Sequence, residues 1–222
     1  MKTDKVIDGV LIKATEPEEG QPYVWPEGVT KIGKYAFLNW HSFNQPFSIP
    51  EGVTEIGEYA FYNWESFNQT FSIPESVTEI GPWAFGNWDS FNQPFSIPEG
   101  VTEIGAWAFS NWDSFNQPFS IPEGVTEIGE YAFYYWNSFN QPFSIPASVT
   151  EIGKYAFYNW KSFNQHNSRR TMATHEWLRI DNWVFAGCYS GKLDQLRERL
   201  DSGKSTPERE KAWEIISKPF SR

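Results

Sequence analysis

Hydrophobic and polar positions alternate along this chain in a unit of 24 residues that recurs with little change. Within residues 47–70 the pattern predicts about seven inward-pointing side chains, separated by short polar stretches. These are Phe47, Ile49, Val53, Ile56, Phe61, Trp64 and Phe67. Apolar residues that alternate with polar ones over a few positions are typical of half-buried strands. We therefore expect two short extended segments in each unit, at 47–49 and at 53–56.

The residues around these segments favour turns. Pro50 cannot donate a hydrogen bond to a neighbouring strand, so the first segment is expected to end there, before a turn at Glu51 and Gly52. Gly57 is expected to permit a tight bend. Residues 58–61 are expected to form a helical turn or a 3₁₀ segment that packs Ala60 and Phe61 inside.

The unit repeats without a change in length. Its tryptophans are Trp40, Trp64, Trp88, Trp112, Trp136 and Trp160. A fixed period of this length indicates a solenoid, in which each turn buries its apolar face against the next turn. We therefore expect superimposed rungs with parallel strands about 4.8 Å apart, so that equivalent residues form columns along the axis.

Three parts of the chain follow from this pattern. Residues 1–22 are expected to form an N-terminal hairpin cap, because Asp8-Gly9 between apolar β-branched residues is a hairpin signal. Residues 23–165 contain the six repeats. Residues 166–222 are expected to hold a degenerate seventh repeat and a helical C-terminal cap.

The seventh repeat is inferred from an alignment. Residues 177–190 align with residues 149–162 at a constant offset, which requires a short insertion within residues 166–176. The alignment places Cys188 at the position of Trp160. Cys188 is the one cysteine of the chain, and we expect it to be a buried core thiol.

Two helices are expected after this repeat. Leucines at a helical period predict the first helix over residues 193–200. Ser205, Thr206 and Pro207 are a helix start signal for the second, over residues 207–217. Because a solenoid exposes its last turn, we interpret both helices as a cap.

The run IPEGVTEIGEYAFYN, residues 49–63, closely resembles the BspA-like leucine-rich repeat, whose units read IPxxVTxIGxxAFxxC. The resemblance covers about residues 6–165, including a hairpin at residues 6–11 that is similar to the family's N-terminal cap. It implies a mainly β, right-handed solenoid with a parallel sheet along one side. It also implies a protein-binding or adhesive function, with no catalytic residues to carry over.

This sequence departs from the family pattern at two places. Tryptophan stands at the usual cysteine position in all six copies, which suggests a wider core filled with aromatic side chains. The SFNQP segment is one residue longer than the usual link and resembles FNIP-type and mycoplasma-type surface repeats. Farther on, residues 185–203 resemble a single ankyrin helix pair, which is an alternative for the C-terminal part.

Composition agrees with an aromatic core, because the chain has 19 Phe, 10 Tyr and 12 Trp. The N-terminus lacks an apolar segment of signal-peptide length, and no segment is apolar enough to span a bilayer. The expected location is therefore cytoplasmic. A trimmed signal or a signal-less route would instead make the protein secreted or surface-associated.

Charge is unevenly distributed along the chain. Residues 1–165 carry 7 Lys and Arg against 20 Asp and Glu, a net charge of −13, whereas residues 166–222 carry 11 against 8, a net charge of +3. An acidic body argues against nucleic-acid binding through the repeats. The acidic groups serve either solubility or the attraction of a charged partner.

Three sets of repeated residues are candidate binding surfaces, each also open to a purely structural interpretation. The aromatic column consists of Tyr35, Tyr59, Trp83, Trp107, Tyr131 and Tyr155. The serine column, expected to point outward from the main sheet, consists of Ser48, Ser72, Ser96, Ser120 and Ser144. The acidic column consists of Glu55, Glu79, Glu103, Glu127 and Glu151, and the turn-glutamate column of Glu51, Glu75, Glu99 and Glu123.

The aromatic column is the first choice for a contact surface, because Tyr and Trp are enriched at interaction hot spots. Its structural alternative is that each half-buried ring packs on its neighbours. Six Asn-Gln pairs, from Asn44-Gln45 to Asn164-Gln165, are interpreted as an amide ladder that satisfies backbone groups. A polar recognition stripe is the alternative for these pairs.

No phosphate-binding loop, zinc spacing or catalytic carboxylate pair is visible, so the sequence predicts no enzyme, no metal site and no cofactor. The first hypothesis is a non-catalytic scaffold that binds another protein of unknown identity. A carbohydrate-binding or cell-surface adhesin is the second. The third is an acidic inhibitor or immunity-type protein for a basic partner. The oligomeric state cannot be derived from these patterns.

Overall fold

A computed structural model describes residues 3–160, 169–172, 175–180, 183–186 and 189–192. The first sheet contains β1 (Lys5–Ile7), β2 (Val10–Lys13), β3 (Lys31–Ile32), β4 (Glu55–Ile56), β5 (Glu79–Ile80), β6 (Glu103–Ile104), β7 (Glu127–Ile128) and β8 (Glu151–Ile152). The second contains β9 (Arg169–Met172), β10 (His175–Ile180), β11 (Trp183–Ala186) and β12 (Tyr189–Lys192). The described residues contain no helix.

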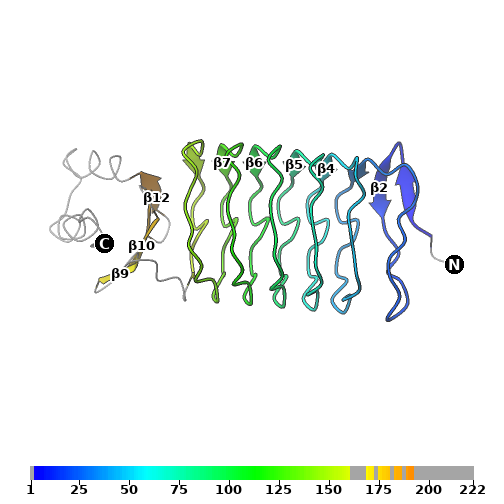
Figure 1. Ribbon diagram of the computed structural model, residues 1–222, viewed down its shortest axis with the longest axis horizontal. Helices are drawn as coiled ribbons and strands as arrows, with labels where there is room; N and C mark the ends of the chain where they lie inside the picture. The colour runs from blue at the N-terminus through cyan, green and yellow to red at the C-terminus, as the bar shows by residue number, and fades with distance from the viewer. Residues whose placement is uncertain (1–2, 161–168, 173–174, 181–182, 187–188, 193–222) are drawn as a thin grey trace.

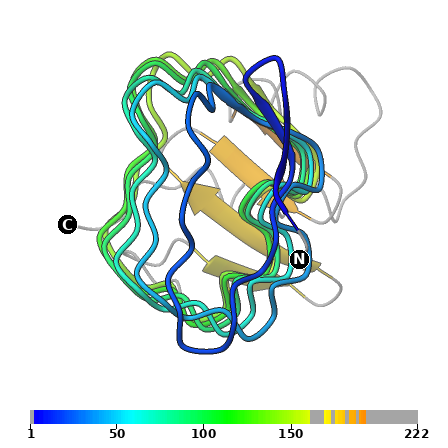
Figure 2. The ribbon, with the colours of Figure 1, turned by 90° about the vertical axis from the view of Figure 1, so that its right-hand side faces the viewer.

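Strands β3 to β8 stack in parallel, one strand for each turn of the chain. Each isoleucine lies opposite the isoleucine one repeat further on, as Ile32 does with Ile56 and Ile128 with Ile152. Figure 1 shows the turns side by side along the long axis, and Figure 2, viewed along that axis, shows them superimposed. The predicted solenoid of superimposed rungs is confirmed.

The tryptophan column, Trp40 to Trp160 at the 24-residue period, shows the same register inside the core. Neighbouring indoles are nearly parallel, with centroids 5.6–5.7 Å apart and interplanar angles of 3–11°. All seven side chains predicted to point inward in the unit at residues 47–70 are buried. Large aromatic rings therefore fill the solenoid, as the replacement of cysteine by tryptophan suggests.

The parallel sheet lies at a different segment from the one that carries the serines. Phe47 and Ile49 are buried and Ser48 is exposed, as alternation predicts, but these residues form no strand. The strand of this rung is Glu55–Ile56. The placement of the serine column on the main sheet is therefore wrong. Pro46 and Pro50 enclose the serine segment, and a segment of three residues between two prolines has few amide donors for a ladder.

The prediction of a helical turn at residues 58–61 is also wrong. Tyr59 has a φ of 56°, in the left-handed region, which cannot continue a 3₁₀ helix. The amides of Tyr59 and Phe61 instead donate to the next rung, to the carbonyl oxygens of Pro82 at 3.0 Å and Ala84 at 2.8 Å. Hydrogen bonds between rungs therefore determine this turn.

A column of glycines, Gly33 to Gly153, follows the parallel strands, and close contact explains it. The predicted tight bend does begin at Gly57, whose carbonyl oxygen accepts a hydrogen bond from the amide of Ala60 at 3.2 Å, but the φ of Gly57 is not positive. A Cβ atom on Gly57 would lie 2.8 Å from the carbonyl oxygen of Ile32, and one on Gly129 would lie 2.5 Å from the amide nitrogen of Ala106. Glycine at this position lets the backbones of neighbouring rungs approach each other.

The predicted N-terminal hairpin is confirmed. Strands β1 and β2 pair antiparallel around Asp8 and Gly9, which have positive φ values of 49° and 76°. Strand β2 then pairs in parallel with β3. Tyr23 and Trp25 contact Phe37 with ring centroids 5.0 and 5.2 Å apart. These two rings, which follow the cap in the chain, thus cover the aromatic core at this end of the solenoid.

The described C-terminal strands form a separate antiparallel sheet, in the order β12-β11-β10-β9. Strand β12 lies next to β8, at the end of the solenoid that Figure 1 colours yellow-green. Strands β10 and β11 contain much of the segment 177–190, and they pair antiparallel, unlike the short parallel strand of a rung. The seventh repeat stays a prediction, whereas Cys188 and the two expected helices lie outside the described residues.

Candidate interaction surfaces

The acidic column lies on the solvent side of the parallel sheet. Each of its glutamates precedes a buried isoleucine in β4 to β8. Neighbouring glutamates lie opposite each other in the ladder, as Glu103 does with Glu127 and Glu127 with Glu151. Like charges at this spacing repel each other. The exposed face of the sheet thus carries these glutamates, and not the serines that the sequence predicted there.

One lysine neutralises the start of the acidic column. Lys31 occupies the equivalent position in β3, and its Nζ lies 2.6 Å from Oε2 of Glu55. The hydrogen bond and charge of Glu55 raise the pKa of Lys31. Within the described part of the chain, the four glutamates of β5 to β8 form no ion pair.

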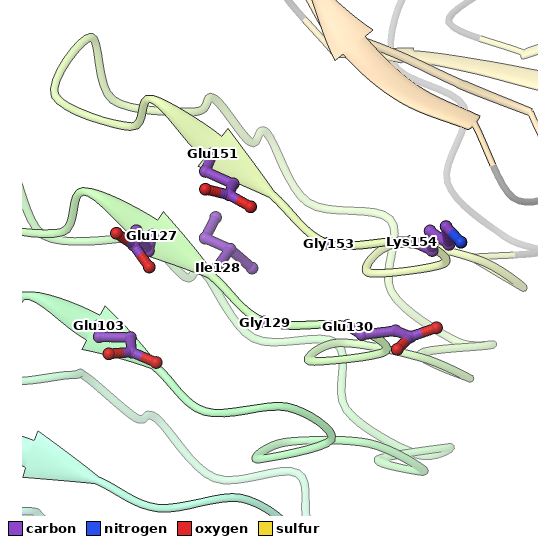
Figure 3. A pocket seen from close by; sticks show the side chains of 8 residues that line it. All are labelled: Glu103, Glu127, Ile128, Gly129, Glu130, Glu151, Gly153 and Lys154. Atoms are coloured by element: carbon purple, nitrogen blue, oxygen red, sulfur yellow. The ribbon is translucent and has the colours of Figure 1, made fainter.

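A shallow hollow of about 300 Å³ adjoins β6, β7 and β8. It is lined by Glu103, Glu127, Ile128, Gly129, Glu130, Glu151, Gly153 and Lys154. Figure 3 shows the three carboxylates of the acidic column on successive strands, with Glu130 and Lys154 beyond the two glycines. Four carboxylates against one ammonium group make the hollow negative.

The aromatic column is a continuous stack of rings. Successive centroids lie 5.2, 5.7, 4.3, 3.9 and 4.8 Å apart, with interplanar angles of 5–25°. Tyr35, at the N-terminal end, is 44% exposed, and the other five rings are half-buried. Packing of each ring on its neighbours is therefore confirmed. Ring faces are largely covered by the stack, which leaves mainly ring edges toward solvent.

The backbone under every ring of the aromatic column is left-handed. The six φ values lie between 56° and 62°. This conformation costs about 1–2 kcal/mol for a residue with a Cβ, and it is unusual for bulky side chains. Because the same turn recurs in each rung, the chain incurs this cost six times.

In the four middle rungs, the size of the ring in the aromatic column varies inversely with the size of the side chain three positions later. The pairs are Tyr59 with Tyr62, Trp83 with Gly86, Trp107 with Ser110, and Tyr131 with Tyr134. A Cβ on Gly86 would lie 3.2 Å from Cε3 of Trp83. The larger indole is thus combined with a small neighbour. Burial, followed by the charge of Tyr135, raises the pKa of Tyr134 to about 12, so this phenol stays neutral at physiological pH.

The serine column and the Asn-Gln pairs occupy other parts of the rung. All five serines are exposed, as predicted, on the segment that precedes the turn glutamates. Asn44 Oδ1 accepts a hydrogen bond from the amide of Asn68 at 2.9 Å and from Nε2 of Gln69 at 3.2 Å. The same contacts recur in later rungs. The interpretation as an amide ladder is confirmed for the pairs that the structure describes, from Asn44-Gln45 to Asn140-Gln141.

A second asparagine ladder was missed by the sequence analysis. Nδ2 of Asn63 donates to Oδ1 of Asn39 at 2.8 Å, and Nδ2 of Asn87 donates to Oδ1 of Asn63 at 2.7 Å. These asparagines also have positive φ values, which asparagine tolerates better than most residues. The sequence does contain a signal for this ladder, because an asparagine stands just before the core tryptophan in most rungs.

Another missed group lies at the first turn of the solenoid. Nζ of Lys34 lies 2.6 Å from Oε2 of Glu58 on the next rung and 4.8 Å from the centroid of the Tyr35 ring. The residue type at this position varies from rung to rung, so no column revealed it. One cation here contacts both a carboxylate and the aromatic column.

The described residues include no group of three or more His, Cys, Asp or Glu side chains arranged to hold a metal ion. Among the same residues, no helix is long and apolar enough to cross a bilayer.

Two solved structures resemble this chain. A leucine rich cell surface protein from Faecalibacterium prausnitzii is 30% identical, with a TM-score of 0.53, and the match covers 70% of this chain and 41% of that chain. A leucine-rich repeat protein from Bacteroides ovatus is 23% identical, with a TM-score of 0.49, over 61% of this chain and 40% of that chain. This chain thus spans about two fifths of the length of either protein. The first of these comparisons does not support the cytoplasmic location expected from the sequence.

No curated protein matches the chain. The model of the BspA type leucine rich repeat region, however, matches residues 21–140 and 89–194, in six copies. These residues include all the rungs of the solenoid, and they make up well over half of the sequence. The chain therefore belongs to the BspA-type leucine-rich-repeat family.

Proposed function

We propose that the chain is a non-catalytic scaffold that binds another protein, with the aromatic column at the centre of the contact. Membership in a leucine-rich-repeat family supports an interaction or surface scaffold. The relative from Faecalibacterium prausnitzii is described as a cell surface protein. A surface or secreted location is therefore part of the proposal.

The observation that carries the proposal is the left-handed backbone beneath the aromatic column. Glycine or asparagine would satisfy the same turn at lower cost. The chain nevertheless places Tyr or Trp there in all six rungs. Strained positions that persist through a structure are typical of functional sites. Rigid rings with polar atoms at their edges are also the side chains that contribute most to protein interfaces.

The stacking favours a protein partner over a sugar. A sugar binds an aromatic platform by covering the face of a ring. Within the column, however, each face lies against the next ring at centroid distances of 3.9–5.7 Å. Ring edges and phenol or indole polar atoms remain for a partner, and these groups suit hydrogen bonds and side-chain packing.

The test compares protein capture by the wild type and by a double variant, Trp83→Asn with Trp107→Asn, using extracts and medium of cells that make the protein. Asparagine tolerates positive φ, so the turn should persist. We expect the circular dichroism spectrum to be retained and the specifically captured protein to be lost. Binding of that protein, once purified, should weaken by at least about tenfold, because hot-spot truncations cost about 2 kcal/mol or more.

The matched control is Ser72→Asn with Ser96→Asn, which changes exposed residues on the same rungs outside the aromatic column. This variant should bind the partner as the wild type does. Partner binding that survives the tryptophan changes, or that is lost with the serine changes, would place the contact elsewhere. Binding to a glycan array that depends on Trp83 and Trp107 would replace the proposal with a carbohydrate-binding function.

A further inference from the structure

We propose that the partner contributes a basic, extended segment that lies along the acidic column of β5 to β8 and beside the aromatic column. This inference rests on the proposed function, because it specifies the chemistry of the same partner. The segment would carry Lys or Arg at regular intervals. Its charged groups would contact the glutamates that form no ion pair within the described part of the chain.

Two lysines of the chain itself show how a cation fits this surface. Lys31 lies in the acidic column and places its ammonium 2.6 Å from Glu55 on the next rung. Lys34 lies at the turn, 2.6 Å from Glu58 and 4.8 Å from the ring centroid of Tyr35. The first contact shows an ammonium on the acidic column. The second shows a cation shared between a carboxylate and the aromatic column, where a cation–π attraction adds to the ion pair.

The later rungs keep the acidic groups and lose most of the cations. The position of Lys31 is glutamate in every rung from β4 to β8. The position of Lys34 becomes Pro82 and Ala106 in the third and fourth rungs. In the hollow beside β6 to β8, four carboxylates face one ammonium, that of Lys154. A basic segment would supply the missing positive charge and relieve repulsion along the column.

The spacing of the rungs favours one conformation of the segment. Parallel strands are about 4.8 Å apart, so alternate glutamates of the column are about 9.6 Å apart. A polyproline II helix rises about 3.1 Å per residue with three residues per turn. Every third side chain therefore points to the same side, at a spacing of about 9.3 Å. One turn of an α-helix rises about 5.4 Å, which differs from the spacing of the rungs, so its side chains lose register with the glutamates within a few rungs. Basic residues at every third position of an extended segment therefore match alternate rungs.

The aromatic column fits the same type of segment. Its Tyr131 and Tyr155 directly follow Glu130 and Lys154 in the chain, and these two residues line the acidic hollow. Aromatic side chains in grooves are the usual recognition surface for polyproline II segments, whose order costs little entropy on binding. The acidic column would contact the basic residues, and the edges of the tyrosines and tryptophans would contact the prolines between them.

The test uses two synthetic peptides of the same composition and the full-length chain. In the first peptide Arg-Pro-Pro units repeat, and in the second the arginines are consecutive and the prolines follow. Isothermal titration at low salt should show tighter binding of the repeating peptide. Its affinity should fall with added salt, because exposed ion pairs are screened. Equal affinity for both peptides, or no binding of either, would overturn the inference.

Two triple variants locate the binding site. The first is Glu103→Gln, Glu127→Gln and Glu151→Gln, in the acidic column. The second is Glu75→Gln, Glu99→Gln and Glu123→Gln, in the exposed turn-glutamate column, which removes the same charge from residues that do not line the hollow. The first triple should weaken binding of the repeating peptide about tenfold, the factor that three exposed ion pairs of ordinary strength supply. The second should change it by less than about threefold.

A similar loss of peptide affinity in both triple variants would mean that the peptide is attracted to the acidic protein in general, and this result would overturn the inference. The proposed function is tested separately, through loss of the native partner in the tryptophan variant. If the tryptophan changes abolish partner capture and the acidic-column triple leaves it intact, the aromatic contact stands and the basic segment is rejected. If neither variant affects capture, both proposals fail.

Discussion

The indole nitrogen of Trp88 donates a hydrogen bond to the carbonyl oxygen of Phe61, 2.7 Å away on the preceding rung. The same bond recurs from Trp64 to Trp160 with lengths of 2.6–2.8 Å. It passes through the buried core, where an unpaired carbonyl oxygen would be costly. Tryptophan therefore joins consecutive rungs in two ways, through stacking with its neighbours and through this bond.

We predict that Trp88→Phe destabilises the protein by about 2–4 kcal/mol, because the smaller ring leaves a cavity and the Phe61 carbonyl loses its donor. Trp88→Cys, which restores the family's usual residue, should cost more because the cavity is larger. Urea unfolding followed by circular dichroism measures both effects. Trp83→Phe is the control, since its ring is half-buried, and it should cost clearly less. A Trp88→Phe variant as stable as the wild type would contradict this account of the core.

The glycine column gives a second prediction, from two glycines on one rung. A Cβ on Gly105 would lie 2.7 Å from backbone atoms of Gly81 and Pro82, which cannot move without separating the rungs. A Cβ on Gly100 would meet its nearest atom, Cγ2 of Thr78, at 3.4 Å. We expect Gly105→Ala to cost about 3 kcal/mol or more, and Gly100→Ala to change stability by less than about 1 kcal/mol.

Urea midpoints of the two alanine variants, measured side by side, check this prediction. Because both changes add one methyl group to the same rung, their difference isolates the close approach between backbones. Similar midpoints for the two variants would show that Gly105 is not needed for stacking.

The sequence predicted the architecture because its strongest signals concern burial. The period of Trp64 and its equivalents requires superimposed rungs, and the spacing of Phe47, Ile49 and Ile56 identifies the inner face. It did not predict which segment forms the sheet. The pattern predicts two extended segments in each unit, and the choice between them depends on prolines and on hydrogen bonds between rungs, which no single repeat reveals.

The candidate surfaces were predicted in part. The aromatic, serine and acidic columns were visible as repeated letters, and all of them reach solvent to some extent. Their backbone conformation was not predictable, because tyrosine and tryptophan ordinarily avoid positive φ and so indicated a helical turn at Tyr59. The site at Lys34 and Glu58 was missed because it depends on a contact between two rungs at a position that varies.

The asparagine ladder permits the cost of the left-handed backbone to be measured. Asn63 has a φ of 65° and bonds to Asn39 and Asn87 through its side chain. Asn63→Ala should lose both the ladder contacts and the tolerance of positive φ, at a cost of about 2–4 kcal/mol. Asn63→Gly should lose the ladder contacts alone. We expect the glycine variant to be more stable than the alanine variant by about 1 kcal/mol.

Thermal and urea unfolding of both variants provide the measurement, and Asn44→Ala is a control in the other amide ladder, where no positive φ occurs. If Asn63→Ala and Asn63→Gly unfold at the same point, the left-handed turn carries no measurable cost. The argument that strain marks the aromatic column as functional would then lose its basis.

Repulsion between acidic residues on neighbouring rungs predicts that the stability of the fold depends on pH. Burial, together with the charges of Asp113 and Glu65, raises the pKa of Asp89. A carboxyl group whose pKa is raised by folding binds its proton more tightly in the folded state. It therefore destabilises the fold at neutral pH, and stability is regained as pH falls through its folded pKa toward the ordinary value of about 3.9.

Asp113→Asn should relieve this repulsion at neutral pH. It should also let residue 113 donate to Asp89, as Nδ2 of Asn137 donates to Oδ1 of Asp113 at 2.9 Å. We expect a gain of less than about 1 kcal/mol at neutral pH, because the groups are partly exposed. The gain should shrink toward pH 3, where Asp89 is protonated. Melting temperatures of the variant and the wild type across this range check it. Glu99→Gln, which removes an equal charge from an exposed turn, should show a smaller gain. A gain that grew as the pH fell would mean that repulsion at Asp89 is not its source.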